Sequence, residues 1–187
     1  MFSLRELPPA VARFYWLARR HARRSGDDFS LLSPARPAEL AELLALARGR
    51  RAIVELGTGT AWSAIALALD DPARRVISCD PISRVEREAY LQMAGAAARA
   101  RIELRAEPDD GGARPGDPPV QLLFIDSSHA REPTAAAFRA WHGALAAGAI
   151  VVFHDHGNPQ YPGVRQAVED LELAGEAHGS MFVWRAP

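Results

Sequence analysis

The sequence of 187 residues contains no lysine, because all 22 of its basic residues are arginine. Mechanisms that need a lysine amine, such as Schiff-base formation, are therefore excluded. It contains a single cysteine, Cys79, which lies in an apolar run and cannot form an internal disulfide bond. We interpret Cys79 as a buried apolar residue and expect the protein to work in the reducing cytoplasm.

Long hydrophobic runs and a dominant charge are also absent. No stretch approaches the roughly 20 apolar residues that span a bilayer. The first nine residues hold an acid and two prolines, where a signal peptide needs an apolar run. The formal net charge is −1, so the chain as a whole offers no strong field to nucleic acid or to a membrane. We expect neither as a partner.

One stretch provides the organising element of the chain. The apolar run Ala52–Leu56 predicts a buried strand, Gly57–Thr60 a tight turn, and Trp62–Leu69 a helix. Two glycines one residue apart allow the backbone to bend sharply and a ligand to approach it. The free N–H groups of the following helix favour a negatively charged group at this turn. The sequence therefore predicts a nucleotide-type binding element.

Strands and helices alternate along the rest of the chain. This pattern predicts an α/β fold with a mostly parallel sheet covered on both faces. We expect an N-terminal helix and lid segment over residues 1–35 and the binding domain over residues 36–187, in one compact unit. The further predicted strands are Arg75–Cys79, Ile102–Arg105, Val120–Ile125, Ala149–Phe153 and Met181–Trp184. The further predicted helices are Pro8–Arg24, Arg36–Arg48, Ser83–Arg99, Glu132–Leu145 and Pro162–Leu173.

Polar side chains follow five of these strands directly. In parallel sheets ligands bind beyond the carboxyl ends of the strands. The sequence therefore predicts one polar rim that holds the binding site. Its members are Gly57, Asp80, Glu107, Asp126 with His129, and His154 with Asp155.

The residue types and spacing in the first half of this rim limit the class of ligand. Asp80 follows the glycine turn by about 20 residues, a separation at which an acid reaches a ribose diol. The alternative is that Asp80 caps a helix starting near Ser83. Trp62 stands where a dinucleotide fingerprint requires a third glycine, which argues against NAD. Glu55, two residues before Gly57, favours a positively charged ligand group such as an amine.

Several motifs resemble those of a known family. Val54–Thr60, Ile77–Asp80 and Leu122–Asp126 look like the nucleotide-binding motifs of class I S-adenosylmethionine-dependent methyltransferases. Residues 124–129, 148–155 and 162–168 resemble the small-molecule O-methyltransferase group that includes macrocin-type sugar methyltransferases. The resemblance extends from about Pro37 to the C-terminus.

The resemblance implies a Rossmann-like fold of three layers, with a doubly wound, mostly parallel sheet of seven strands. A shortened C-terminal hairpin is expected, with the partner of the last strand near residues 176–178. The resemblance also implies that the glycine turn holds the methionine part of S-adenosylmethionine, Asp80 the ribose, and Glu107 or Asp109 the adenine. The cofactor contacts expected are Glu55, Gly57, Thr58, Gly59, Thr60, Trp62, Asp80, Glu107 and Asp126.

Methyl transfer from a sulfonium needs alignment, exclusion of water and removal of a proton from the acceptor. His129 is the candidate base, with Asp126 and Asp155 as further catalytic candidates; the alternative is that His129 caps the following helix. The resemblance implies that Asp126 and Asp155 could hold Mg²⁺. The flanking His154 and His156 shift the preference towards Zn²⁺, Fe²⁺ or Mn²⁺, or indicate no metal.

The expected function is methyl transfer from S-adenosylmethionine to an oxygen of a small-molecule acceptor, by a protein that could form a homodimer. Two alternatives stay open at this point. One is a related enzyme on the same fold that transfers no methyl group, such as a hydroxylase-like or metal-dependent enzyme, which the histidine-rich rim suggests. The other is a non-catalytic S-adenosylmethionine-binding module, which the short C-terminal hairpin suggests.

Overall fold

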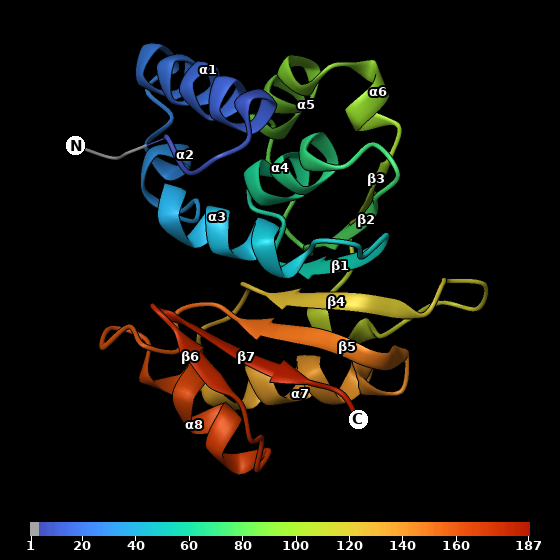
Figure 1. The fold of residues 1–187 in the computed structure, drawn as a ribbon. Coiled ribbons are helices and arrows are strands. Elements are labelled where there is room, and N and C mark those ends of the chain that lie inside the picture. Colours follow the sequence, from blue (N-terminus) through green and yellow to red (C-terminus); the bar gives the residue numbers. More distant parts are fainter. Residues whose placement is uncertain (1–3) are drawn as a thin grey trace.

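A computed structural model describes residues 4–187, so the first three residues of the N-terminal segment 1–35 lie outside it. The described strands form one sheet in the order β3-β2-β1-β4-β5-β7-β6 (Figure 1). Neighbours are parallel from β3 to β5, and β7 runs antiparallel to both β5 and β6. The strands are β1 (Ala52–Leu56), β2 (Arg75–Cys79), β3 (Ile102–Arg105), β4 (Val120–Ile125), β5 (Leu145–Phe153), β6 (Glu176–His178) and β7 (Met181–Arg185).

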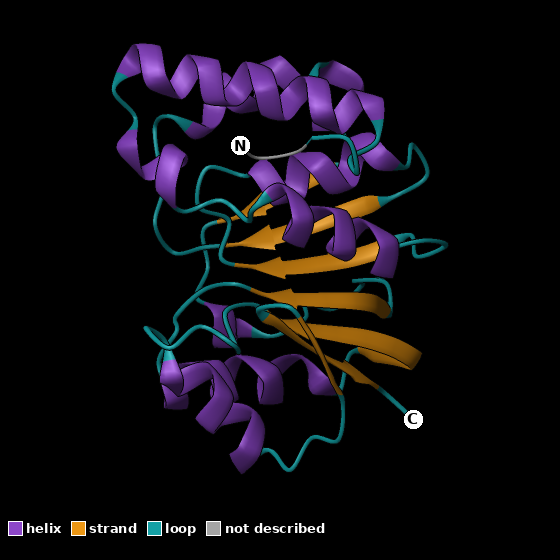
Figure 2. Cartoon of the chain, turned by 60° about the vertical axis from the view of Figure 1, so that its left-hand side comes forward, coloured by secondary structure: helices purple, strands orange, loops and turns teal. Residues whose placement is uncertain are grey.

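Helices cover both faces of this sheet, as Figure 2 shows. Five of them pack against one apolar core on one face, and two pack against a second core on the other face. The first group is α1 (Pro9–Ser25), α3 (Pro37–Leu46), α4 (Trp62–Asp70), α5 (Arg87–Ala94) and α6 (Ala96–Arg99), and the second is α7 (Arg131–His142) and α8 (Pro162–Asp170). The short helix α2 (Asp28–Leu32) lies near the carboxyl ends of the strands and lines the cleft there.

The central strands are buried on both faces, as their unbroken apolar runs predict. In β4, Leu122 and Phe124 belong to one core, whereas Leu123 and Ile125 belong to the other. All four are 3% exposed or less. This alternation fixes the register of β4 against its neighbours, because a slip of one residue would exchange the two sets of side chains.

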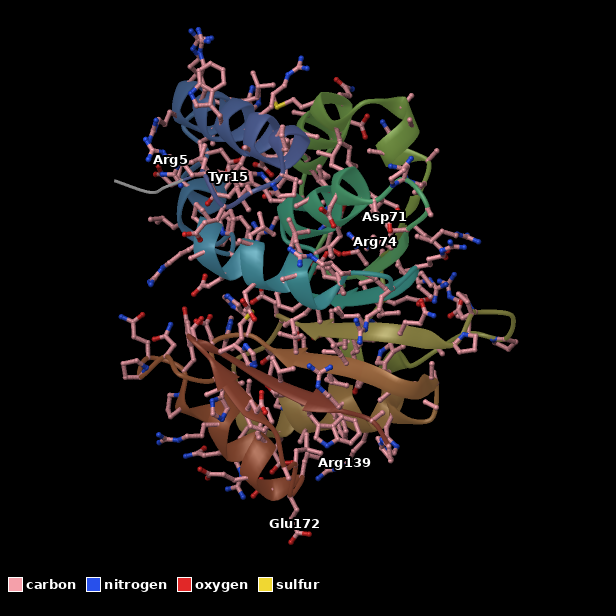
Figure 3. The ribbon with its side chains drawn as sticks, in the orientation of Figure 1. Arg5, Tyr15, Asp71, Arg74, Arg139 and Glu172 are labelled. Carbon is pink, nitrogen blue, oxygen red and sulfur yellow. The ribbon has the colours of Figure 1, made fainter. Side chains whose placement is uncertain are left out.

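Polar and aromatic contacts tie the N-terminal helices to the sheet. The Tyr15 hydroxyl donates to the carbonyl of Ala35, and its ring meets Trp62 edge-to-face at 5.3 Å (Figure 3). The buried guanidinium of Arg74 donates to the carbonyls of Ala47 and Leu67, at the ends of α3 and α4. These bonds satisfy C-terminal carbonyls that a helix leaves free.

Three of the predicted helices differ from the structure by three residues or more. The helix predicted over Pro162–Leu173 ends at Asp170. The helix predicted over Ser83–Arg99 starts only at Arg87 and breaks at Gly95, whose φ of 83° is outside the helical region. The helix predicted over Glu132–Leu145 ends at His142, and β5 already begins at Leu145. The early part of β5 pairs with Val120 across a register irregularity, which its small, weakly apolar residues did not indicate.

The expected C-terminal hairpin is confirmed in place and in length. Its outer strand β6 has only three residues and pairs with β7 from Glu176↔Val183 to His178↔Met181. The sheet therefore has the seven strands expected, with a short edge strand. Among residues 4–187, none of the helices has the length and apolar character to span a membrane.

The carboxyl ends of β1 and β4 meet at Gly57. The Asp126 N–H donates to the carbonyl of Leu56, and the Gly57 N–H donates to that of Cys79, each at 2.8 Å. Gly57 has a φ of 98°, and a Cβ placed on it would lie 2.0 Å from the backbone oxygen of Asp126. Only glycine fits there, because both the torsion and the neighbouring strand exclude a side chain.

We predict that Gly57→Ala destabilises the fold by more than about 2 kcal/mol, since it adds backbone strain and a clash with a buried backbone. Gly143→Ala is the matched control, because Gly143 has a φ of −68° and open space around its Cα. The control should change stability by less than about 1 kcal/mol. Urea denaturation of the three proteins measures both effects. Equal stability of Gly57→Ala and the control would contradict the close approach.

Candidate functional site

A cleft of about 480 Å³ opens at the carboxyl ends of the central strands. The glycine turn and Asp80 line one part of it, Asp126 and His129 another, and α2 with Tyr161 lines its outer side. Of the predicted rim, Gly57, Asp80, Asp126 and His129 line this cleft, whereas Glu107, His154 and Asp155 are not among its lining residues. A second hollow of about 360 Å³ lies over β1–β3 beneath the loop 114–118, away from the glycine turn.

The glycine turn presents backbone to this cleft. Gly59 has a φ of 51°, and its Cα lies beneath the ring of Phe29 from α2. The Ser30 hydroxyl donates to the Thr60 hydroxyl at 2.9 Å, so α2 is fastened to the turn at a second point. The short helix α2 thus lies against the turn.

Asp80 connects the turn to the end of β2. One carboxylate oxygen accepts the Gly59 N–H at 2.9 Å, and the other accepts the Ile82 N–H at 2.8 Å. Because α5 begins only at Arg87, Asp80 does not cap a helix at Ser83. The carboxylate lies in the cleft wall and keeps lone pairs free for hydroxyl donors.

Glu55 lies behind the turn and is fully buried. Its carboxylate accepts hydrogen bonds from the hydroxyls of Ser63 and Ser78. Ser78 is in turn 2.7 Å from the Thr58 hydroxyl, which reaches the cleft wall. Burial raises the pKa of Glu55 to about 7, although the two serine hydroxyls act in the opposite direction. The residue predicted to meet a ligand amine therefore supports the turn from beneath.

Two histidines and two aspartates converge at the other end of the cleft. Asp126 and His129 follow β4, and His154 and Asp155 follow β5. His129 Nε2 lies 3.0 Å from Asp155 Oδ2, and His154 Nδ1 lies 2.9 Å from Asp126 Oδ1. Asp155 has a φ of 57°, a strained value for a residue with a side chain. Its other carboxylate oxygen accepts the amide of Asn158 at 2.9 Å, which holds it in this conformation.

The ring of His129 is held in place on two sides. It stacks on Tyr161 with centroids 4.1 Å apart, and its Nε2 faces Asp155. The facing carboxylates of Asp126 and Asp155 raise the pKa of His129 to about 9. For His154, burial disfavours the charged form, but Asp126 and the other carboxylates around the ring raise its pKa well above the usual range.

The family of the chain follows from this geometry and from a direct comparison. A family model described as a methyltransferase domain matches residues 54–156, which is more than half of the chain. The chain belongs to this methyltransferase family. The match begins in β1, just before the glycine turn, and ends just after the His154–Asp155 pair, so it contains both ends of the cleft.

Solved methyltransferase structures share the fold. An O-methyltransferase from Bacillus cereus with bound S-adenosylhomocysteine superposes with a TM-score of 0.72 and 16% identity, covering 96% of this chain and 91% of that one. TomG of Streptomyces achromogenes, from tomaymycin synthesis and solved with S-adenosylmethionine, gives 0.69 and 22%, covering 96% and 91%. CalS11, a TDP-rhamnose 3′-O-methyltransferase of calicheamicin biosynthesis, gives 0.66 and 19%, covering 94% and 92%. No curated protein matches the sequence.

The methyltransferase cleft includes most of the residues proposed from the sequence. Gly57, Thr58, Gly59, Thr60, Trp62, Asp80, Asp126 and His129 all line it. Trp62 is also largely buried among Phe14, Tyr15 and Tyr90. Glu107 is turned towards Arg114, and Asp109, the alternative from the sequence, lines the cleft in its place.

Sequence reasoning missed Glu39 of α3. Its carboxylate lies 3.5 Å from His154 Nε2 and accepts the Ser180 hydroxyl at 2.6 Å. Glu39 also accepts the Arg36 N–H at the start of α3, which is the only role its position in the sequence indicates. Burial opposes its charge, but His154 and Ser180 lower the pKa of Glu39 to about 2.

The histidine–aspartate cluster fits a divalent ion. Its four ligand atoms lie within 4.8 Å of one another. Within the described part of the chain, His129 Nε2 and both ring nitrogens of His154 are buried without a hydrogen bond of good geometry. Buried polar atoms without partners are rare, and two of these, His129 Nε2 and His154 Nδ1, face the same two aspartates. Nitrogen and carboxylate donors of this kind bind first-row metals.

The buried carboxyl of Glu55 generates a prediction. Its pKa is about 7 in the folded chain and near 4.5 when unfolded. A raised pKa means that stability is greatest below pH 4.5 and is lost as the pH rises towards 7. Between pH 4.5 and pH 7, the free energy of unfolding of the wild-type protein should fall by roughly 3 kcal/mol relative to that of Glu55→Gln. Chemical denaturation at several pH values measures it, and parallel pH profiles for both proteins would contradict the assignment.

Proposed function

We propose that the protein transfers a methyl group from S-adenosylmethionine to an oxygen of a small-molecule acceptor. One observation carries this proposal: in a chain of the methyltransferase family, a single cleft joins the glycine turn and Asp80 to Asp126 and His129. The cleft thus offers a nucleoside site and a proton acceptor next to each other. Neighbours of the same fold from calicheamicin biosynthesis and tomaymycin synthesis support a small acceptor.

The cofactor would lie along the wall formed by β1 and β2. The backbone of Gly57–Thr60 would receive the methionine part, and the Asp80 carboxylate would accept hydrogen bonds from the ribose hydroxyls. The cleft wall near Asp109 would hold the adenine. This placement directs the sulfonium methyl towards His129, since the turn and His129 line the same cleft.

The acceptor would enter between α2 and Tyr161. Phe29, Pro34 and Tyr161 line this part of the cleft and give it an apolar character. Such walls exclude water and hold the acceptor oxygen in line with the methyl group. In its neutral form, His129 would take the hydroxyl proton as the carbon–oxygen bond forms, and S-adenosylhomocysteine would leave as a neutral thioether.

The cluster would also hold a divalent ion through Asp126 and Asp155, with His129 and His154 adjacent. Such an ion, when bound, supplies positive charge that favours the deprotonated acceptor oxygen. The stacking of His129 on Tyr161 and its contact with Asp155 fix the direction from which the proton is accepted.

The cellular setting belongs to the same proposal. We place the reaction in the cytoplasm, in keeping with the single buried cysteine, and without nucleic acid as a partner. A homodimer would cover the exposed apolar side chains of Leu32, Ile82 and Val85 near the mouth of the cleft.

We predict that His129→Ala lowers kcat by about 10²- to 10⁴-fold because the general base is lost, with little change in cofactor affinity. His142→Ala, an exposed histidine at the end of α7, is the control and should keep full turnover. Methyl transfer to a panel of small hydroxylated acceptors measures kcat, and calorimetry measures S-adenosylmethionine binding. Unchanged turnover in His129→Ala would remove its role as base, and absence of cofactor binding in the wild type would overturn the proposed function.

A further inference from the structure

The imidazole of His154 lies between three carboxylates from different parts of the fold. Its Nδ1 is 2.9 Å from Asp126 Oδ1 and 3.3 Å from Asp155 Oδ2, whereas its Nε2 is 3.5 Å from Glu39 Oε2. The side chain is only 7% exposed, and its ring meets Phe124 edge-to-face. The ring is therefore held in one orientation, with each nitrogen facing a different acidic partner.

The two nitrogens face different surroundings. Nδ1 points into the space that Asp126, Asp155 and His129 share, where the ligand atoms converge. Nε2 points away from that space, towards α3. A neutral imidazole carries a proton on one nitrogen and a lone pair on the other, so its outer hydrogen bond decides which nitrogen can bind a cation.

Glu39 lies on the outer side of the ring, where a hydrogen bond would fix which nitrogen carries the proton. Its own orientation is set by the Arg36 N–H at 2.7 Å and by the Ser180 hydroxyl at 2.6 Å, so it is held by both α3 and the β6–β7 hairpin. Carboxylates that accept the outer N–H of an imidazole orient the ring and make the inner nitrogen a better ligand.

We propose that Glu39 is the positioning residue of His154: it accepts the Nε2 proton and thereby directs the Nδ1 lone pair into the cluster. With Asp126 and Asp155, this gives a centre of one imidazole nitrogen and two carboxylates, beside His129, that takes a first-row transition ion such as Mn²⁺, Fe²⁺ or Co²⁺ in preference to Mg²⁺. The inference rests on the ion-binding part of the proposed function and goes beyond it in naming the class of ion and the residue that sets it.

Ligand chemistry supports this choice of ion. Mg²⁺ prefers oxygen donors and keeps several waters, whereas imidazole suits Mn²⁺, Fe²⁺, Co²⁺ and Zn²⁺. Removing one imidazole should therefore weaken transition ions far more than Mg²⁺.

The experiment titrates the full-length protein, stripped of metal with EDTA, with CoCl₂ and separately with MgCl₂. Calorimetry gives both affinities, and the visible absorption of bound Co²⁺ reports on nitrogen ligation. We expect Co²⁺ to bind about 100-fold more tightly than Mg²⁺, and we expect His154→Ala to remove most of that preference. Equal affinities, or a Co²⁺ spectrum that is the same in wild type and His154→Ala, would overturn the proposal.

Two variants on α3 test the positioning role. Glu39→Gln should weaken Co²⁺ binding by about 10- to 100-fold and change the Co²⁺ spectrum, since the amide cannot hold the Nε2 proton as a carboxylate does. Glu42→Gln is the matched control: Glu42, on the same helix, lies 2.8 Å from His178 Nδ1, in a separate glutamate–histidine pair. The control should bind Co²⁺ as the wild type does. Equal losses in both variants, or none in Glu39→Gln, would contradict the role of Glu39.

Measuring cofactor binding distinguishes a failure of the metal-centre proposal from a failure of the methyl-transfer proposal. S-adenosylmethionine affinity is measured in the same samples and also reports whether each variant is folded. If the wild type binds S-adenosylmethionine but shows no preference for Co²⁺, this inference fails and the proposed function stands. If Co²⁺ binds as expected and S-adenosylmethionine does not, the methyl-transfer proposal fails and the metal centre stands. If Glu39→Gln does not fold, Ser180→Ala replaces it, and an unchanged Co²⁺ spectrum in that variant would count against the positioning role.

Discussion

The close approach of β1 and β4 at Gly57 is the constraint on which the site depends. Because Asp126 N–H bonds to the carbonyl of Leu56, the chain after β4 passes directly over the chain after β1. The space that a side chain would need at Gly57 is already filled by the Asp126 backbone. The glycine turn and the histidine–aspartate cluster are thus adjacent because β1 and β4 pair with each other. Gly57 is required by the protein's own packing before any ligand is considered.

Carboxylates hold the remaining parts of the site together. Asp80 joins the turn to the end of β2 through the Gly59 and Ile82 N–H groups. Glu55 joins the start of α4 to β2 from below, through Ser63 and Ser78. Glu39 joins α3 to the C-terminal hairpin through Ser180. Each of these acids makes contacts between elements that are far apart in the sequence, so the cleft is set by tertiary contacts more than by its loops.

Much of the fold could be predicted from the sequence, because its signals are local. The mainly apolar strands β1, β2 and β4, the glycine turn, and the position of β6 are all confirmed, as are the seven-stranded sheet and the methyltransferase family. The helix over 83–99 was wrong because alanine-rich sequence masked the break at Gly95. The start of β5 was missed because Ala146, Ala147 and Gly148 carry little strand propensity.

Less of the candidate site than of the fold could be predicted from the sequence. The clustering of Asp126, His129, His154 and Asp155 follows from two strand ends and a parallel sheet, so it could be anticipated. The burial of Glu55 behind the turn could not be anticipated, because its position in a strand does not show whether its carboxylate contacts a ligand or a serine. Glu39 carried no signal at all, because its partners His154 and Ser180 come from the far end of the chain.

A crystal structure with S-adenosylhomocysteine tests the central claim most directly. The account predicts density across Gly57–Gly59, with the ribose hydroxyls on the Asp80 carboxylate and the sulfur facing His129. The contradicting result would be a ligand bound elsewhere, such as the hollow over β1–β3, or a ribose remote from Asp80.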